Sequence, residues 1–234
     1  MPKREIHVGS RKRKTFSLSA AIFDLDGTVL NNEPVYGQAF KKVLQDLGIF
    51  IEDKYPHLSG IGIKESWDYL VKRFKIQTTR SLEDLVKATQ EAYAEKLPGV
   101  QFQKGFAQFA GELKRHGIAL ALATSNDAQM LEKVDGVFDL KRFFSVMTTK
   151  EEVPHLKPAP DLFLKAAEKL NMRPENCVVV EDTRAGIEAA HRAGMEAVGI
   201  ASDPQRTEDL HEAKLIIPDF EGLTVEKLLM HISP

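Results

Sequence analysis

Two aspartates at the end of a short apolar run are the residues of this sequence whose types and spacing best suit chemistry. Asp24 and Asp26 follow Ala20-Ala-Ile-Phe23 and precede Gly27. The run is typical of a buried strand, and residues two apart in a strand project to the same side, so both carboxylates would lie together. Adjacent acids repel each other unless a cation offsets them, which favours a divalent metal and phosphate chemistry. The alternative is a strand that enters an ordinary Asp-Gly turn.

Length and charge limit the classes of protein to which this chain can belong. Its 234 residues suffice for one large core, or for a core with a small accessory domain. The net charge of -2 gives no electrostatic reason to expect nucleic-acid binding. No apolar run approaches the ~18 residues that span a membrane, and no secretory signal precedes the first strand. We therefore expect a soluble, cytoplasmic protein, and nothing in the sequence points to an obligate protein partner.

The single cysteine and the basic N-terminus both have structural explanations. Cys177 precedes three valines and can form no intrachain disulfide, so we expect a buried structural thiol in a reducing compartment. Residues 1–17 form a basic tail that contains Arg11-Lys-Arg-Lys14. A solvated tail is the preferred interpretation, and a basic arm or targeting signal is the alternative.

The segment 34–98 has the pattern of an all-helical insert. Its first helix places Phe40, Val43, Leu44 and Leu47 at helical spacing and ends at Gly48. Residues 66–74 and 82–97 continue the helical pattern. Proline and glycine residues mark both ends of the segment. We predict a small helical cap domain that is inserted after the first strand.

The rest of the chain alternates between apolar strands and amphipathic helices. Strands are expected at 118–123, 144–147, 177–180, 197–200 and 215–217, and helices at 106–117, 158–170 and 183–193. This alternation predicts an α/β fold, with a Rossmann-like parallel sheet that is covered by helices on both faces and formed by residues 18–33 and 99–234. Ligands of such sheets bind beyond the carboxyl ends of the strands. Three of those ends carry Asp24 and Asp26, Thr124 and Ser125, and Glu181 and Asp182.

Four motifs in order make the chain resemble the haloacid dehalogenase superfamily, in its branch of phosphatases and beta-phosphoglucomutase-like proteins with a helical cap. The motifs are Asp24-Leu-Asp-Gly-Thr28, Thr124, Lys157-Pro-Ala-Pro-Asp161 and Glu181-Asp-Thr183. The resemblance extends from about Leu18 to the C-terminus. A single motif is weak, but four in order on the predicted strands and loops are specific.

The resemblance implies roles for the four acids. Asp24 would be the nucleophile that takes up the phosphoryl group, and Asp26 the acid and base that protonates the leaving group and activates water. Asp24, the main-chain carbonyl of Asp26 and Asp182 would hold Mg²⁺, and Glu181 would assist. An oxygen-only ligand set suits Mg²⁺, which retains bound water.

The resemblance also implies a phosphate-binding set. Lys157 would supply a positive charge to the phosphoryl oxygens, while Thr124 and the main-chain amide of Ser125 hold the phosphate for in-line attack. Each residue alone has a simpler explanation. Thr124 and Ser125 would cap the following helix, and Lys157 would be a solvated loop charge. Only the presence of all these residues at one sheet edge favours phosphate binding over these simpler explanations.

The cap is expected to close over the site and contact the leaving group. Candidates for substrate specificity are Glu33, Tyr36 and Lys64, the last of which ends a glycine-containing loop at 59–64. By offset from the first motif, Tyr36 and Lys64 stand where beta-phosphoglucomutase-like members usually carry His and Arg. Asn31-Asn-Glu33 replaces the usual Asp-Ser-Glu, which puts the hydrogen bonding of the hinge in question.

The resulting prediction is a Mg²⁺-dependent phosphomonoester hydrolase. Its substrate would be a small phosphorylated metabolite of the sugar phosphate or phosphoglycolate type, and its intermediate a phosphorylated Asp24. Thr28 fits the phosphatase form of the first motif. A sugar-phosphate mutase and a catalytically inactive binding protein on the same fold are the alternatives. A dehalogenase is a poorer fit, since that reaction needs no metal.

Overall fold

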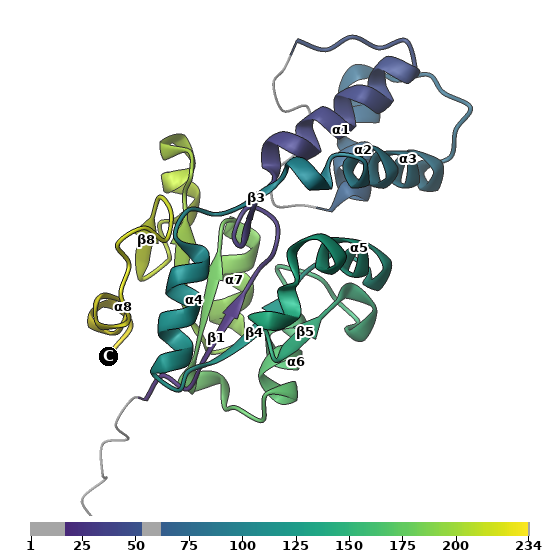
Figure 1. The fold of residues 1–234 in the computed structure, drawn as a ribbon. Coiled ribbons are helices and arrows are strands. Elements are labelled where there is room, and N and C mark those ends of the chain that lie inside the picture. Colours follow the sequence, from purple (N-terminus) through teal and green to yellow (C-terminus); the bar gives the residue numbers. More distant parts are fainter. Residues whose placement is uncertain (1–16, 53–61, 234) are drawn as a thin grey trace, which may run out of the picture.

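A six-stranded parallel sheet forms the centre of the molecule. The computed structural model describes residues 17–52 and 62–233. The strands are β1 (Ala20–Phe23), β4 (Ala119–Ala123), β5 (Val146–Thr148), β6 (Cys177–Glu181), β7 (Glu196–Ile200) and β8 (Leu215–Ile217). Their order is β5-β4-β1-β6-β7-β8, and all neighbouring pairs are parallel (Figure 1). The predicted α/β fold is confirmed, and β1 lies in the middle of the sheet.

Helices cover both faces of this sheet, as the alternation predicted. The strand residues alternate between two cores: Ala21 and Phe23 face one, and Ala20 and Ile22 face the other. The first core contains residues of α4 (Phe106–Arg115), α5 (Ala128–Phe138) and α8 (Val225–Ile232). The second contains residues of α6 (Asp161–Lys169) and α7 (Arg184–Arg192). Strands buried on both faces explain the continuous apolar runs in the sequence.

The insert consists of three helices with a core of their own. They are α1 (Glu33–Asp46), α2 (Ile63–Phe74) and α3 (Leu82–Ala94). Phe40, Val43, Trp67 and Leu85 belong to one cluster of buried residues. The indole nitrogen of Trp67 donates to the hydroxyl of Thr89 over 2.8 Å. Figure 1 shows this helical cap at the carboxyl ends of the sheet strands.

A short antiparallel pair of strands joins the cap to the sheet domain. β2 (Leu30–Asn31) pairs with β3 (Gln101–Phe102) where the chain enters and leaves the cap, with the 3₁₀ turn Leu97–Gly99 just before β3. The sequence pattern did not predict this pair. Two residues are too short a segment to show the alternation that identifies a strand.

Two predicted boundaries are wrong for physical reasons. The helix expected from 158 begins at Asp161, because Pro158 and Pro160 lack the main-chain N–H and Pro160 is its N-cap residue. The strand expected at 144–147 is β5, Val146–Thr148. Phe144 instead follows the 3₁₀ turn Leu140–Arg142, and the centroid of its buried ring lies 5.9 Å from that of Phe23. Core packing rather than strand pairing explains this apolar residue.

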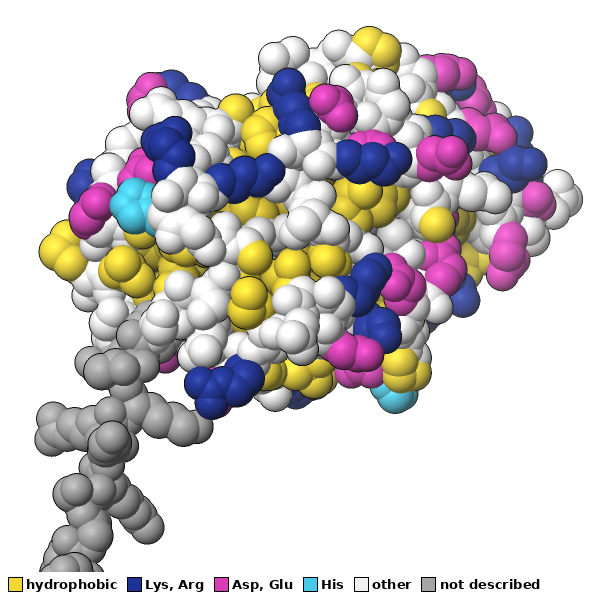
Figure 2. Space-filling view, turned by 60° about the horizontal axis from the view of Figure 1, so that its bottom comes forward, with side chains coloured by type: hydrophobic (Ala, Val, Ile, Leu, Met, Phe, Trp, Pro, Cys, Tyr) yellow, Lys and Arg dark blue, Asp and Glu magenta, His cyan; other side chains and the backbone are white. Residues whose placement is uncertain are grey.

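Three further observations concern the chain as a whole. Cys177 is buried, as predicted, and burial raises the pKa of its thiol to about 11. Within the described ranges, none of the helices has the length and apolar character to cross a bilayer. Over the described part of the face drawn in Figure 2, basic and acidic side chains are interspersed. Residues 1–16 of the predicted tail and residues 59–61 of the predicted cap loop at 59–64 lie outside the described residues.

Candidate active site

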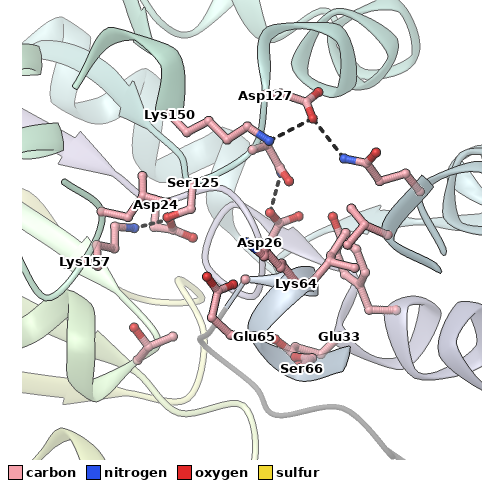
Figure 3. Close-up of a pocket in the computed structure, with 18 of the residues that line it drawn as sticks. Asp24, Asp26, Glu33, Lys64, Glu65, Ser66, Ser125, Asp127, Lys150 and Lys157 are labelled. Atoms are coloured by element: carbon pink, nitrogen blue, oxygen red, sulfur yellow. Dashed lines mark hydrogen bonds and ion pairs between the residues drawn. The ribbon is translucent and has the colours of Figure 1, made fainter. Parts of the chain in front are cut away.

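The cavity between the cap and the carboxyl ends of the strands brings most of the predicted residues together (Figure 3). Its volume is about 390 Å³. The predicted residues that line it are Asp24, Asp26, Glu33, Tyr36, Lys64, Ser125, Lys157 and Glu181. Thr124 and Asp182 are buried and do not line the cavity. Parallel strands place these distant segments side by side, since their carboxyl ends share one edge.

Asp24 and Lys157 form the buried ion pair at the centre of this site. The main-chain N–H of Asp24 donates to the carbonyl of Val180 over 3.0 Å, which fixes the residue to the sheet. Lys157 Nζ contacts Asp24 Oδ1 and lies 2.7 Å from Glu181 Oε1. Burial raises the pKa of Asp24 to about 8, although Lys157 opposes this shift. Burial lowers the pKa of Lys157, but Asp24 and Glu181 outweigh that effect and raise it.

Asp26 is held between two asparagines. Asn32 Nδ2 donates to its Oδ1 over 2.5 Å, and Asn126 Nδ2 donates to its Oδ2 over 2.6 Å. Burial raises the pKa of Asp26 to about 6, while the two amide hydrogen bonds lower it. Both asparagines fix the direction in which the carboxyl group points, so Asp26 is positioned independently of Asp24.

Asn32 also answers the question about hinge hydrogen bonding. Its Oδ1 accepts from the main-chain N–H of Gly27 over 3.0 Å, and its Nδ2 donates to the hydroxyl of Tyr93 over 2.7 Å. One buried side chain therefore ties the first motif to helix α3 of the cap. The only sequence signal for this role of Asn32 was the departure from the usual motif at Asn31-Asn-Glu33. Asn126 was not predicted either, although that residue belongs to the polar run after β4.

Asp182 lies behind the cavity and has two charged or polar partners. Thr28 Oγ1 donates to its Oδ1 over 3.2 Å, and Arg206 Nη1 donates to its Oδ2 over 3.3 Å. Arg206 Nη2 also donates to the main-chain carbonyl of Asp182 over 2.9 Å. Gly27 packs against this carboxylate with φ +80°, and a Cβ there would lie 2.3 Å from Oδ2. No sequence signal linked Arg206, which lies 24 residues further along the chain, to this site.

Glu181 orients Lys157 in this structure. Its Oε1 accepts from Lys157, and its Oε2 accepts from the main-chain N–H of Thr183 over 2.6 Å. Gly186 makes room for it, because a Cβ at that position would lie 1.9 Å from the Glu181 carboxyl carbon. The predicted assistance of Glu181 to a metal remains a prediction.

The strand-end hydroxyls have different surroundings. Thr124 Oγ1 accepts from the main-chain N–H of Asn126 over 3.1 Å, so it stabilises the turn that presents Asn126. Ser125 lines the cavity directly. The predicted phosphate contacts of both residues remain predictions.

The cap contributes an aromatic wall and a charged rim. The ring of Tyr36 stacks on that of Tyr93, with centroids 4.0 Å apart and planes at 6°. Glu33 is the first residue of α1 and Lys64 lies in the first turn of α2, and both line the cavity. Trp67 belongs to the core of the cap.

The donor set at this edge fits a divalent cation. No three Asp, Glu, His or Cys side chains within 17–52 and 62–233 converge on one point. The set expected for Mg²⁺ does not require three, since it uses the carboxylates of Asp24 and Asp182, the main-chain carbonyl of Asp26 and water. All these donors are oxygens. Burial and the neighbouring Glu181 raise the pKa values of both carboxyl groups, and a divalent cation would offset this accumulation of negative charge.

Comparisons with known proteins agree with the fold. Residues 21–200 match the haloacid dehalogenase-like hydrolase family. The chain is 34% identical over 190 residues to a phosphorylated carbohydrates phosphatase of Thermotoga maritima, which covers 77% of this chain and 84% of that protein. It is 28% identical over 220 residues to beta-phosphoglucomutase of Bacillus subtilis, with 90% and 94% covered. The crystal structure of CbbY from Rhodobacter sphaeroides in complex with phosphate matches with a TM-score of 0.79 and 26% identity, covering 90% of this chain and 99% of that one.

The parallel sheet, the cap and the acids at the strand ends define an α/β hydrolytic enzyme with a helical cap. This chain belongs to the haloacid dehalogenase-like hydrolase family. The family, the fold class and the enzyme class that the sequence predicted are therefore confirmed.

Proposed function

We propose that this protein is a Mg²⁺-dependent phosphomonoester hydrolase of small sugar phosphates, acting through a phosphorylated Asp24. The observation that carries the proposal is the division of roles at one sheet edge. Asp24 is paired with Lys157, whereas Asp26 is held apart by two amides. A nucleophile beside a cation, next to a separately positioned acid, is the arrangement that phosphate ester hydrolysis requires. Relatives named as phosphatases, including one for phosphorylated carbohydrates, support it.

The chain's own residues account for both chemical steps. An Asp24 oxygen attacks phosphorus, the bond from phosphorus to the ester oxygen breaks, and Asp26 gives its proton to that oxygen. Asp26 then takes a proton from water, whose oxygen attacks the phosphoryl group, and Asp24 is released. Lys157 and the main-chain amide of Ser125 hold the phosphoryl oxygens during both steps. Asp24, Asp182 and the main-chain carbonyl of Asp26 would hold Mg²⁺, which would supply positive charge to offset the negative charge of the phosphate.

A mutase is less well supported than a hydrolase. The beta-phosphoglucomutase relative shares the fold and covers most of the chain. However, the position at which the family resemblance implies a His carries Tyr36, and its ring is stacked on Tyr93. A stacked phenol offers no group that titrates near neutrality. An inactive binding protein is disfavoured because Asp24, Asp26 and Lys157 are all present at the cavity.

Phosphate release from a panel of metabolites tests the proposal directly. With Mg²⁺, the wild-type protein should release inorganic phosphate, whereas Asp24→Asn should lose at least ~10³-fold in kcat. Chelation should abolish release, and added Mg²⁺ should restore it. Asp135→Asn, which changes an acid of α5 that does not line the cavity, should retain full activity. Mass spectrometry of the quenched reaction should find one phosphoryl group on Asp24. Interconversion of glucose phosphates without phosphate release would instead establish the mutase.

A further inference from the structure

A polar cluster on the cavity wall is not used by the chemistry described above. It consists of Gln90 from α3 of the cap, Asp127 at the start of α5 and Lys150 after β5, and all three residues line the cavity. Gln90 Nε2 donates to Asp127 Oδ2 over 2.9 Å, and Lys150 Nζ donates to the same oxygen over 3.1 Å. Figure 3 shows Asp127 and Lys150 on one side of the cavity, beyond Asp26. We call these three residues the wall cluster.

The wall cluster lies where the leaving group must extend. Asp26 has to face the ester oxygen, and Asn126 joins Asp26 to the segment that carries Asp127. In Figure 3, Asp24 and Lys157 lie to one side of Asp26, whereas the wall cluster lies in another direction. A phosphate held by Asp24 and Lys157 therefore directs the rest of the substrate past Asp26, along this wall.

Asp127 keeps acceptor capacity for a ligand. Its Oδ1 accepts from the main-chain N–H of Met130 over 2.8 Å, which caps helix α5. With Gln90 and Lys150, this makes three hydrogen bonds to described residues, and a carboxylate has about four acceptor positions. The amide oxygen of Gln90 and the ammonium of Lys150 add a further acceptor and further donors. A mixed set of acceptors and donors fits hydroxyl groups, which do both.

The charge of the cavity disfavours a second anionic group on the substrate. Six acids line it: Asp24, Asp26, Glu33, Glu65, Asp127 and Glu181. Three lysines oppose them, and two of these are already paired, Lys150 with Asp127 and Lys157 with Asp24. With one divalent cation bound and Asp26 protonated, as the first chemical step requires, the formal charges of the lining cancel, so no positive charge is left for a second anionic group. A carboxylate or a second phosphate would add repulsion, whereas neutral hydroxyl groups would not.

From these observations we propose that Asp127 is a specificity-determining residue that accepts a hydrogen bond from a hydroxyl of the leaving group, with Lys150 and Gln90 holding it in place. The substrate class that follows is the monophosphate of a neutral polyhydroxylated chain or ring. Phosphoglycolate and sugar bisphosphates would be poor substrates. This inference rests on the proposed function, because it describes the leaving-group side of the same site.

The substitution Asp127→Asn tests the inference with little damage to the fold. Asparagine caps a helix as well as aspartate does, so α5 keeps its N-cap. The oxygen that accepts from Gln90 and Lys150 becomes an NH₂ group, which faces two donors, so these two side chains no longer hold residue 127 in place for the hydroxyl, and its negative charge is lost. Asp135→Asn is the matched control, since Asp135 lies on the same helix, pairs with Lys141 over 2.7 Å and does not line the cavity.

Four probes distinguish a specificity role from a structural one: fructose 1-phosphate, fructose 1,6-bisphosphate, phosphoglycolate and an aryl phosphate without hydroxyl groups. In the wild type, fructose 1-phosphate should be the best of the first three. Asp127→Asn should lower its kcat/KM by about 10- to 100-fold, mainly through KM, as expected for a lost hydrogen bond to a charged group. The aryl phosphate should change less than about twofold, since it makes no such bond. Activity on the bisphosphate relative to the monophosphate should rise, because Lys150 loses its counter-charge.

Contrary outcomes are equally clear. Equal losses on all four probes would show that Asp127 only supports the fold, and a wild-type preference for phosphoglycolate would overturn the substrate class. Calorimetric titration of fructose 1-phosphate into Asp24→Asn, with and without Asp127→Asn, measures the contact without turnover. If no probe is hydrolysed but Asp127→Asn weakens this binding, the proposed function fails and the inference stands. If the aryl phosphate is hydrolysed but the binding is unchanged, the inference alone fails.

Discussion

The two sides of this cavity, the sheet edge and the cap, are held in place in different ways. At the sheet edge, strand pairing fixes the backbone, as in the bond from Asp24 N–H to Val180, and the side chains of Lys157 and Glu181 are buried. On the cap side, the side chains come from α1, α2 and α3. These helices join the sheet domain through the two-residue strands β2 and β3. The proposed reacting groups are therefore held by the sheet, whereas the contribution of the cap to substrate contacts, such as that of Gln90 to Asp127, depends on how the cap lies against the core.

Among the residues that support the site, Gly27 should give the largest loss of kcat/KM when substituted, because it packs against Asp182 at the sheet edge. In Gly27→Ala the added Cβ would lie 2.3 Å from Asp182 Oδ2, at a φ of +80° that L-residues rarely adopt. Displacing the carboxylate by about 1 Å should cost about 10²-fold or more in kcat/KM. Steady-state kinetics on an aryl phosphate measures this loss. Gly136→Ala, at a helical position with nothing within 4 Å, is the control that should keep its activity. Unchanged kinetics in Gly27→Ala would show that Asp182 tolerates displacement.

Removing one of the amides that hold Asp26 should have the next largest effect. Asn126→Leu deletes the donor to Asp26 Oδ2. We expect kcat to fall about 10- to 100-fold on alkyl phosphates, the range typical of impaired proton transfer. Aryl phosphates should lose much less, because their leaving groups need little protonation. The ratio of the two losses is the measurement, and equal losses would mean that Asn126 does not act through Asp26.

Arg206 offers a test of how the sheet edge accommodates a metal. It donates to both the side chain and the main chain of Asp182, so its positive charge opposes a second cation there. Arg206→Met should therefore tighten Mg²⁺ binding by about 3- to 10-fold, as expected for losing a partly screened charge interaction. Isothermal titration with Mg²⁺ in the absence of substrate measures this change. Weaker binding would show instead that Arg206 positions Asp182 for the metal.

The smallest effect is expected where the cap meets the hinge. Tyr93→Phe removes the hydroxyl that accepts from Asn32 and should cost about 1 kcal/mol of stability, the usual value for one hydrogen bond. Because Asn32 still bonds to Asp26 and Gly27, kcat on an aryl phosphate should change less than about threefold. Urea unfolding and kinetics on the same samples test both statements. A large loss of kcat with unchanged stability would show that the hinge acts in catalysis.

The sequence alone was enough to predict the enzyme class and the architecture of the sheet. Apolar strand runs, helical spacing and the four motifs sufficed to predict a Rossmann-like hydrolase with a helical insert, because burial on both faces and short motifs leave local traces. They also placed Asp24, Asp26 and Glu181 at one edge, since parallel strands end on the same side, whereas the role of Lys157 followed from the family resemblance. The predicted boundaries were wrong at 158–160, where prolines delay the start of the helix, and at 144–147, where core packing explains the apolar residue.

Only the tertiary structure decided which side chains hold these residues in place. Asn32 and Asn126 around Asp26, Arg206 on Asp182, and Gln90 on Asp127 are contacts between segments that are far apart in the chain or come from different elements. Hydrogen bonds of this kind follow no periodicity and need only one polar atom at the right point in space. The sequence predicts which groups react, whereas the fold decides which partners orient them.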